Sequence, residues 1–129
     1  MATARAYARI DRPADEVWAL VTDPTALPAW FPGVQESTFE GDVRTVTTTT
    51  GVVVRERIVT NDADLRRFQY SLLDLPGLES HLATVDVLPD GAGVIAVYAA
   101  DVKPDAAGAQ MQQSVTAAVE GLKKAVETG

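Results

Sequence analysis

One carboxylate in this sequence lies in surroundings that predict unusual acid–base chemistry. Residues 52–60 alternate as a strand does, and Glu56 falls on the more apolar of its two faces. The other members of that face are Val52, Val54 and Ile58. If the face is internal, burial raises the pKa of Glu56 and suits it to act as a general acid or base near neutral pH. The alternative is a structural ion pair with an arginine such as Arg44 or Arg57.

The register of this strand decides which of two neighbours faces inward. In the alternation above, Arg57 lies on the opposite face from Glu56, together with Arg55. A β-bulge would invert the register and direct Arg57 to the interior instead. Arg57 therefore stays an alternative candidate for the same site.

His81 is the single histidine of the chain. It shares the more apolar face of a predicted strand with Ala83, Val85 and Val87, where a neutral imidazole can accept or deliver a proton. The alternative is a partly hydrated histidine with no function, at the end of a strand that follows a turn at residues 75–77. Because there is one histidine and no cysteine, a site with several histidine or thiolate ligands is excluded, and we expect no metal.

Aromatic side chains alternate on two further strands and are predicted to face inward. Phe68 and Tyr70 share one face of residues 65–73, and Tyr98 shares a face with small and aliphatic residues of 93–102. A tyrosine supplies an apolar ring and a hydroxyl that can orient a ligand oxygen or complete a proton relay with Glu56. Ordinary core packing is an equal alternative for each aromatic residue taken alone.

A long amphipathic helix over residues 105–127 must cover these groups. Its apolar positions recur at steps of three and four. They are Met111, Val115, Ala118, Val119, Leu122, Ala125 and Val126. Their only available partner is a sheet, and a helix laid across a curved sheet encloses a cavity where the facing side chains are small or polar. We predict that Met111 and Val115 contact a ligand there.

The remaining elements complete an α+β order. Residues 3–10 alternate as a strand with alanines inside, Pro13 begins a short helix, and Asp23-Pro24 predicts a second that runs to Trp30. Trp30 is a candidate wall of the cavity. Six strands joined by short turns then form an antiparallel meander, over residues 34–40, 43–50, 52–60, 65–73, 79–88 and 93–102.

Composition excludes several classes of function. A net charge of −7 and a pI near 4.5, with scattered basic residues, argue against nucleic-acid binding. No serine lies in a G-x-S-x-G elbow, and no glycine-rich loop opens a helix, so we expect neither a serine hydrolase nor a nucleotide cofactor. No stretch approaches the roughly 18 apolar residues of a membrane span. The 129 residues fit one domain, which we expect to be cytoplasmic.

Three segments carry a resemblance to a known family: Ile10 to Trp18, Leu27 to Gly33, and Val43 to Arg57. Together they resemble the polyketide cyclase/dehydrase branch of the START/Bet v 1-like (SRPBCC) superfamily, across essentially the whole chain. The resemblance implies a helix-grip fold, a curved antiparallel sheet of about seven strands wrapped around a long C-terminal helix, with two short helices after the first strand. It also implies a cavity for a hydrophobic or aromatic molecule, and an inward arginine such as Arg57 that holds an enolate or carbonyl oxygen.

Two functions follow and stay open. The first is binding of a polyketide-like molecule with cofactor-independent cyclisation, dehydration or isomerisation, in which Glu56 acts as acid/base, Arg57 or Tyr70 orients the ligand and His81 carries a second proton. The second is a non-catalytic carrier or sensor of apolar small molecules. The sequence is compatible with a monomer or a homodimer. A collapsed interaction module would instead lack a pocket of even about 300 Å³.

Overall fold

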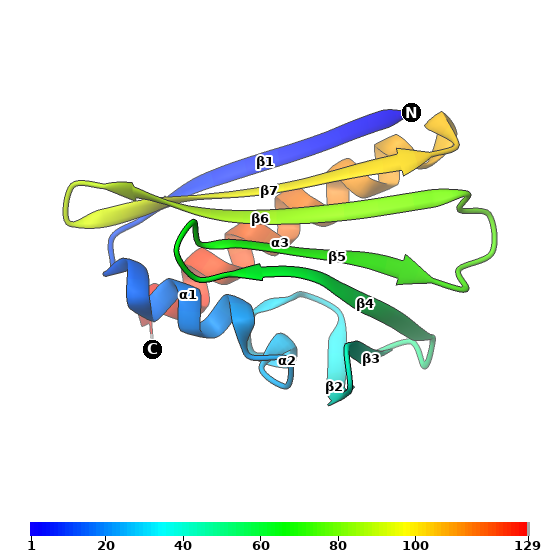
Figure 1. Cartoon of the computed structure of the whole chain (residues 1–129), viewed down its shortest axis with the longest axis horizontal. Helices are drawn as coiled ribbons and strands as arrows, with labels where there is room; N and C mark the ends of the chain where they lie inside the picture. Colours follow the sequence, from blue (N-terminus) through cyan, green and yellow to red (C-terminus); the bar gives the residue numbers. More distant parts are fainter. Residues whose placement is uncertain (129) are drawn as a thin grey trace.

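A computed structural model describes residues 1–128 and contains one antiparallel sheet with a long helix across one face (Figure 1). The sheet order is β1-β7-β6-β5-β4-β3-β2. The strands are β1 (Ala2–Ile10), β2 (Val34–Glu40), β3 (Val43–Thr48), β4 (Val53–Asp62), β5 (Arg67–Leu73), β6 (Ser80–Asp90) and β7 (Gly93–Lys103). The helices are α1 (Ala14–Thr22), α2 (Leu27–Trp30), the 3₁₀ turn η1 (Asp105–Ala107) and α3 (Gly108–Thr128). This is the predicted helix-grip fold.

The topology follows from the short connections. Each strand from β3 to β7 pairs with its predecessor, whereas β1 pairs with β7, so that β1 and β2 are the two edges of the sheet. Helices α1 and α2 connect β1 to β2 and lie at one end of the sheet, near the C-terminal half of α3 (Figure 1). None of the helices in residues 1–128 is long and apolar enough to span a membrane.

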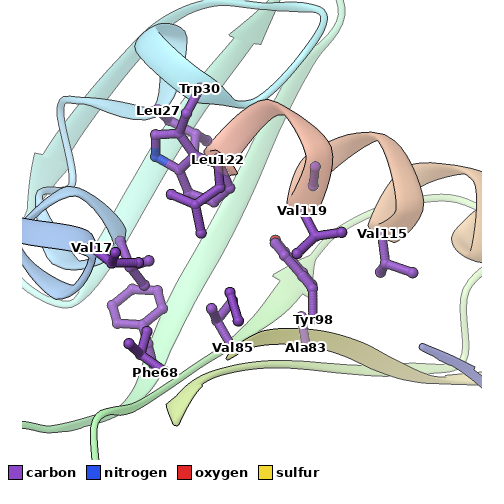
Figure 2. Packing of buried hydrophobic residues seen from close by; sticks show 14 of the residues in the cluster. Val17, Leu27, Trp30, Phe68, Ala83, Val85, Tyr98, Val115, Val119 and Leu122 are labelled. Atoms are coloured by element: carbon purple, nitrogen blue, oxygen red, sulfur yellow. The ribbon is translucent and has the colours of Figure 1, made fainter. Parts of the chain in front are cut away.

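Alternating burial assigns one face of the sheet to the core. Every second residue is buried from His81 to Val87 on β6 and from Val94 to Val102 on β7, and most of these residues share one core cluster with the apolar stripe of α3. Figure 2 shows Val85 and Tyr98 of the sheet pointing toward Leu122 and Val119 of α3, and the ring of Phe68 beside Val17 of α1. The core therefore lies between the sheet and this helix.

Side chains of α3 cover the backbone of the edge strand β1. The Gln112 amide accepts a hydrogen bond from the Arg5 backbone N–H (3.0 Å) and donates one to the Arg5 carbonyl oxygen (2.9 Å). Lys123 donates to the Arg9 carbonyl oxygen (2.7 Å). An exposed strand edge invites pairing with another chain, so these contacts both anchor α3 and protect β1.

Element boundaries differ from the predictions where side chains form local turns. The second helix begins at Leu27 and not after Pro24, because the Asp23 carboxylate accepts hydrogen bonds from the backbone N–H and hydroxyl of Thr25 and holds a turn there. Strand β3 ends at Thr48, whose hydroxyl contacts the backbone of Val52 and turns the chain before β4.

Candidate functional site

A cavity of about 380 Å³ lies between the sheet and the first half of α3. Its position follows from side-chain size, because Ala83 and Ala100 face each other across β6 and β7 at this end. At the other end of the sheet, Phe68, Val85 and Leu122 belong to the filled core. The polar side chains of the lining are Thr48, Thr49, Thr50, Glu56, Tyr70, His81, Tyr98 and Ser114. The remaining lining residues are aliphatic or aromatic, or proline or glycine.

The lining carboxylate belongs to a buried ion pair. Glu56 lies directly opposite Arg44 in the β3–β4 register, and Arg44 is 1% exposed. Two of the three Arg44 nitrogens reach the same oxygen, with Nε at 2.7 Å and Nη2 at 2.6 Å from Glu56 Oε1. Burial raises the pKa of Glu56, and the charge and hydrogen bonds of Arg44 oppose that rise. Within residues 1–128 no hydrogen bond reaches Oε2, which leaves this oxygen for a bound molecule.

Arg44 is also held by aromatic rings. Its guanidinium carbon lies 5.3 Å from the Tyr70 ring centroid and 5.7 Å from that of Phe68. Such cation–π contacts stabilise a cation that has left water. Arg44 therefore supports Glu56 from behind, and it is not among the residues that line the cavity.

Two tyrosine hydroxyls meet inside the cavity. Tyr70 of β5 and Tyr98 of β7 form a hydrogen bond to each other across the intervening β6. Burial raises the pKa of both phenols, so both are neutral at physiological pH. One hydroxyl donates to the other, which leaves one O–H group free to donate to a ligand oxygen.

His81 is held as a neutral imidazole. Its Nδ1 accepts a hydrogen bond from the Leu72 backbone N–H (3.1 Å), so the proton of the neutral ring is on Nε2. Burial lowers the pKa of His81 to about 4. The ring lies 5.7 Å from the Tyr70 ring, between centroids, and lines the cavity. His81 therefore presents an uncharged donor at physiological pH.

Comparison with known proteins identifies the family of the chain. The model of the family described as polyketide cyclase / dehydrase and lipid transport matches residues 1–127. The chain belongs to this family. No functionally curated protein matches the sequence.

Solved structures share the fold of this polyketide cyclase / dehydrase family member. The protein XoxI from Bacillus cereus superposes with a TM-score of 0.90 at 20% identity, covering 98% of this chain and 96% of XoxI. The di-domain ARO/CYC BexL from the BE-7585A biosynthetic pathway superposes with a TM-score of 0.82 at 22% sequence identity, covering 98% of this chain and 47% of BexL. A START superfamily protein from Mycobacterium smegmatis superposes with a TM-score of 0.75 at 14% sequence identity, covering 98% of this chain and 94% of that protein. At these identities the similarity shows the fold.

In this family member the structure brings six of the predicted site residues to the cavity. They are Glu56, Tyr70, His81, Tyr98, Met111 and Val115. The inward orientation of Glu56 follows from an unbroken β3–β4 register, because the bulge of β4 lies beyond it, between Ile58 and Thr60. The roles predicted for these residues remain predictions.

The alternative register, with Arg57 inward, is wrong. Arg57 lies on the outer face of β4, its side chain is 53% exposed, and its Nε is 3.3 Å from Asp42 Oδ2. A bulge before Glu56 would have inverted the strand, and the pairing from Val43 to Thr47 contains none. Arg57 therefore does not reach the cavity.

Two aromatic residues predicted to contact a ligand lie in the packed core. Phe68 is buried beside Arg44 at the filled end of the sheet, and Trp30 lies against Leu122 and Gly121 of α3 (Figure 2). Neither lines the cavity. The next residue after Trp30, Phe31, does so instead. The four-residue helix α2 is too short for its periodicity to distinguish the two positions.

Sequence reasoning also missed the threonine-rich rim. Thr48, Thr49 and Thr50 line the cavity where the β3–β4 hairpin turns, and the Thr49 backbone N–H donates to the Gly33 carbonyl oxygen (2.9 Å). The run of threonines predicts a strand but not its turn. Within residues 1–128 no three His, Asp or Glu side chains gather to hold a metal ion.

The buried histidine predicts a stability loss in mild acid. Since the folded pKa of His81 is about 4 against 6.5 in the unfolded chain, the folded state binds fewer protons. The stabilisation is complete above pH 6.5 and is lost as the pH falls toward 4, by roughly 2–3 kcal/mol. We expect His81→Asn, whose Oδ1 can still accept from Leu72 N–H, to lack this loss.

Urea unfolding of both proteins across this pH range measures the effect. His81 is the only histidine, and the carboxylates are common to both proteins, so the difference between the two curves isolates its titration. Parallel curves would show that His81 titrates alike in the folded and unfolded states.

Proposed function

We propose that this protein binds a small, largely apolar molecule with oxygen or nitrogen substituents inside the cavity. The observation that carries the proposal is the arrangement of the lining, in which apolar walls surround a cluster formed by Glu56, the tyrosine pair and His81. A volume of about 380 Å³ lies within the range of small-molecule sites. Apolar walls supply affinity, and a few fixed polar groups set orientation.

The preorganisation of these polar groups supports the proposal. Arg44 fixes Glu56, the Leu72 amide fixes His81, and Tyr70 and Tyr98 fix each other. Groups that are already ordered lose little side-chain entropy when a ligand arrives. The family description, polyketide cyclase / dehydrase and lipid transport, is consistent with a ligand of this kind.

A second proposal, cofactor-independent proton transfer, rests on the free oxygen of Glu56. Its raised pKa suits a group that takes and returns a proton. On a bound ketone, Oε2 would remove a proton from the carbon next to the carbonyl, and the resulting enolate oxygen would accept a hydrogen bond from the tyrosine pair. In a β,γ-unsaturated ketone, return of that proton to the γ-carbon completes an isomerisation. In a β-hydroxy ketone, the enolate expels the β-hydroxyl group, which takes the proton from Glu56 and leaves as water, and this completes a dehydration. His81 Nε2–H is a second donor for the same oxygen.

Filling the mouth of the cavity tests binding. Met111 lines the cavity from α3, and Gln113 is exposed two residues away. We expect saturable, equimolar binding of the neutral fluorophore N-phenyl-1-naphthylamine to the unmodified protein and to Gln113→Trp. Met111→Trp should weaken it at least roughly tenfold, because the indole occupies the site. Fluorescence titration measures all three proteins.

Either of two results in this titration contradicts the binding proposal. The first is no saturable binding to the unmodified protein. The second is equal binding by Met111→Trp and Gln113→Trp, which would place the fluorophore outside the cavity.

Deuterium exchange into 2-tetralone tests proton transfer. We expect the protein to accelerate exchange at the carbons beside the carbonyl, and Glu56→Gln to lower that rate by roughly 10²–10⁴-fold, as expected for loss of a general base. Glu36→Gln, on the exposed face of β2, should leave the rate unchanged. Mass spectrometry follows the incorporation. An unchanged rate in Glu56→Gln, or no acceleration by the unmodified protein, would leave a carrier or sensor and remove the catalytic proposal.

A further inference from the structure

The charges of the cavity restrict the ligand further than its shape does. We infer that the cavity accepts neutral or cationic molecules that donate a hydrogen bond to Glu56, and that it rejects carboxylates of the same size. This inference rests on the proposed function, because it requires that the cavity binds a ligand. Beyond the proposed function, it specifies the charge of the ligand and its ability to donate a hydrogen bond.

The ion pair presents its negative end to the cavity. Both contacting nitrogens of Arg44 bind Glu56 Oε1, and the guanidinium lies behind the carboxylate, away from the lining. A ligand therefore meets Oε2, an acceptor with no partner in the described part of the chain. The positive charge is separated from the cavity by the carboxylate that it neutralises.

No positive charge faces the cavity from the other elements. Among residues 1–128 the lining includes neither lysine nor arginine. His81 is neutral at physiological pH, and Tyr70 and Tyr98 are neutral phenols. The other polar side chains are the hydroxyls of Ser114 and the threonine rim. An anionic ligand would thus enter without a counter-charge.

The tyrosine pair lies next to the ion pair, since the Arg44 guanidinium carbon is 5.3 Å from the Tyr70 ring centroid. Burial raises the pKa of both phenols, and the negative charge of Glu56 acts in the same direction. The same field opposes any carboxylate placed near Tyr70 and Tyr98. A hydroxyl or ammonium group placed there is favoured, since it can donate to Oε2.

Three probes that share a naphthalene ring test the hydrogen-bond preference and the charge preference separately. 2-Naphthol is neutral and donates a hydrogen bond, 2-methoxynaphthalene is neutral without a donor, and 2-naphthoate is an anion at neutral pH. A hydrogen bond to a charged acceptor predicts that 2-naphthol binds roughly tenfold tighter than 2-methoxynaphthalene. Burial of an anion that has no counter-charge of its own and faces Glu56 Oε2 predicts at least about a hundredfold preference for 2-naphthol over 2-naphthoate. Isothermal titration calorimetry gives the three Kd values.

Two variants assign the selectivity to the ion pair. Glu56→Gln leaves Arg44 as an uncompensated cation, so we expect the order to reverse and 2-naphthoate to bind most tightly. The double variant Arg44→Met/Glu56→Leu removes both charges with apolar side chains of similar size, so 2-naphthol and 2-methoxynaphthalene should bind within about threefold. Circular dichroism checks folding, and the double variant keeps the test valid if Glu56→Gln is unfolded.

The outcomes distinguish this inference from the function on which it rests. If 2-naphthoate binds the unmodified protein as tightly as 2-naphthol, the inference is overturned and the binding proposal stands. The inference is also overturned if the double variant keeps the full preference for 2-naphthol over 2-methoxynaphthalene. If none of the three probes binds and N-phenyl-1-naphthylamine also fails, the binding proposal falls and this inference falls with it.

Discussion

A guanidinium and a carboxylate buried together on adjacent strands constrain the rest of the interior. Moving either ion from water costs several kcal/mol, so each needs the other. Arg44 and Glu56 meet because they lie directly opposite each other in the β3–β4 register. A slip of one residue would place either group on the wrong face and leave its partner uncompensated. The pair therefore fixes the register of these strands and, through it, the wall of the cavity.

The same pair explains why the interior is polar at one end and apolar at the other. Arg44 contacts the rings of Phe68 and Tyr70, which ties β3 to β5 across β4. Beyond Phe68 the core is filled by large apolar side chains from the sheet, α1 and α3. On the other side of Tyr70, alanines at positions 83 and 100 leave space. The cavity forms where the side chains become small, and the ion pair and the tyrosine pair hold Glu56, Tyr70 and Tyr98 in place in its lining.

Strand alternation, the period of the last helix and the family resemblance together predicted the fold, and alternation favoured an inward Glu56 while the inverted register stayed open. Alternation was not sufficient to identify the partner of Glu56. Arg44 and Arg57 were both available by sequence, and the choice depends on the pairing of β3 with β4. The contact between Tyr70 and Tyr98 depends on two such pairings, since β6 separates their strands.

The misplaced residues have local causes. Trp30 ends a helix of one turn and Phe31 follows it with extended backbone, so helical periodicity does not indicate which of the two side chains faces the cavity. Phe68 shares the inner face with Tyr70, but alternation gives the face and not the position along it, and Phe68 falls at the filled end. The threonine rim depends on a hairpin turn that the Thr48 hydroxyl holds in place. Residue type alone predicted that the strand continues through these threonines.

A double-mutant cycle on Arg44 and Glu56 measures whether each buried charge depends on the other. The free energy of unfolding is measured in urea for the unmodified protein, Arg44→Met, Glu56→Leu and the double variant. If each charge is buried and compensated only by the other, either single substitution costs roughly 3–5 kcal/mol, and the double variant is more stable than both single variants. If instead the two single effects are small and simply add, the charges are separately hydrated, and the ion pair does not constrain this interior.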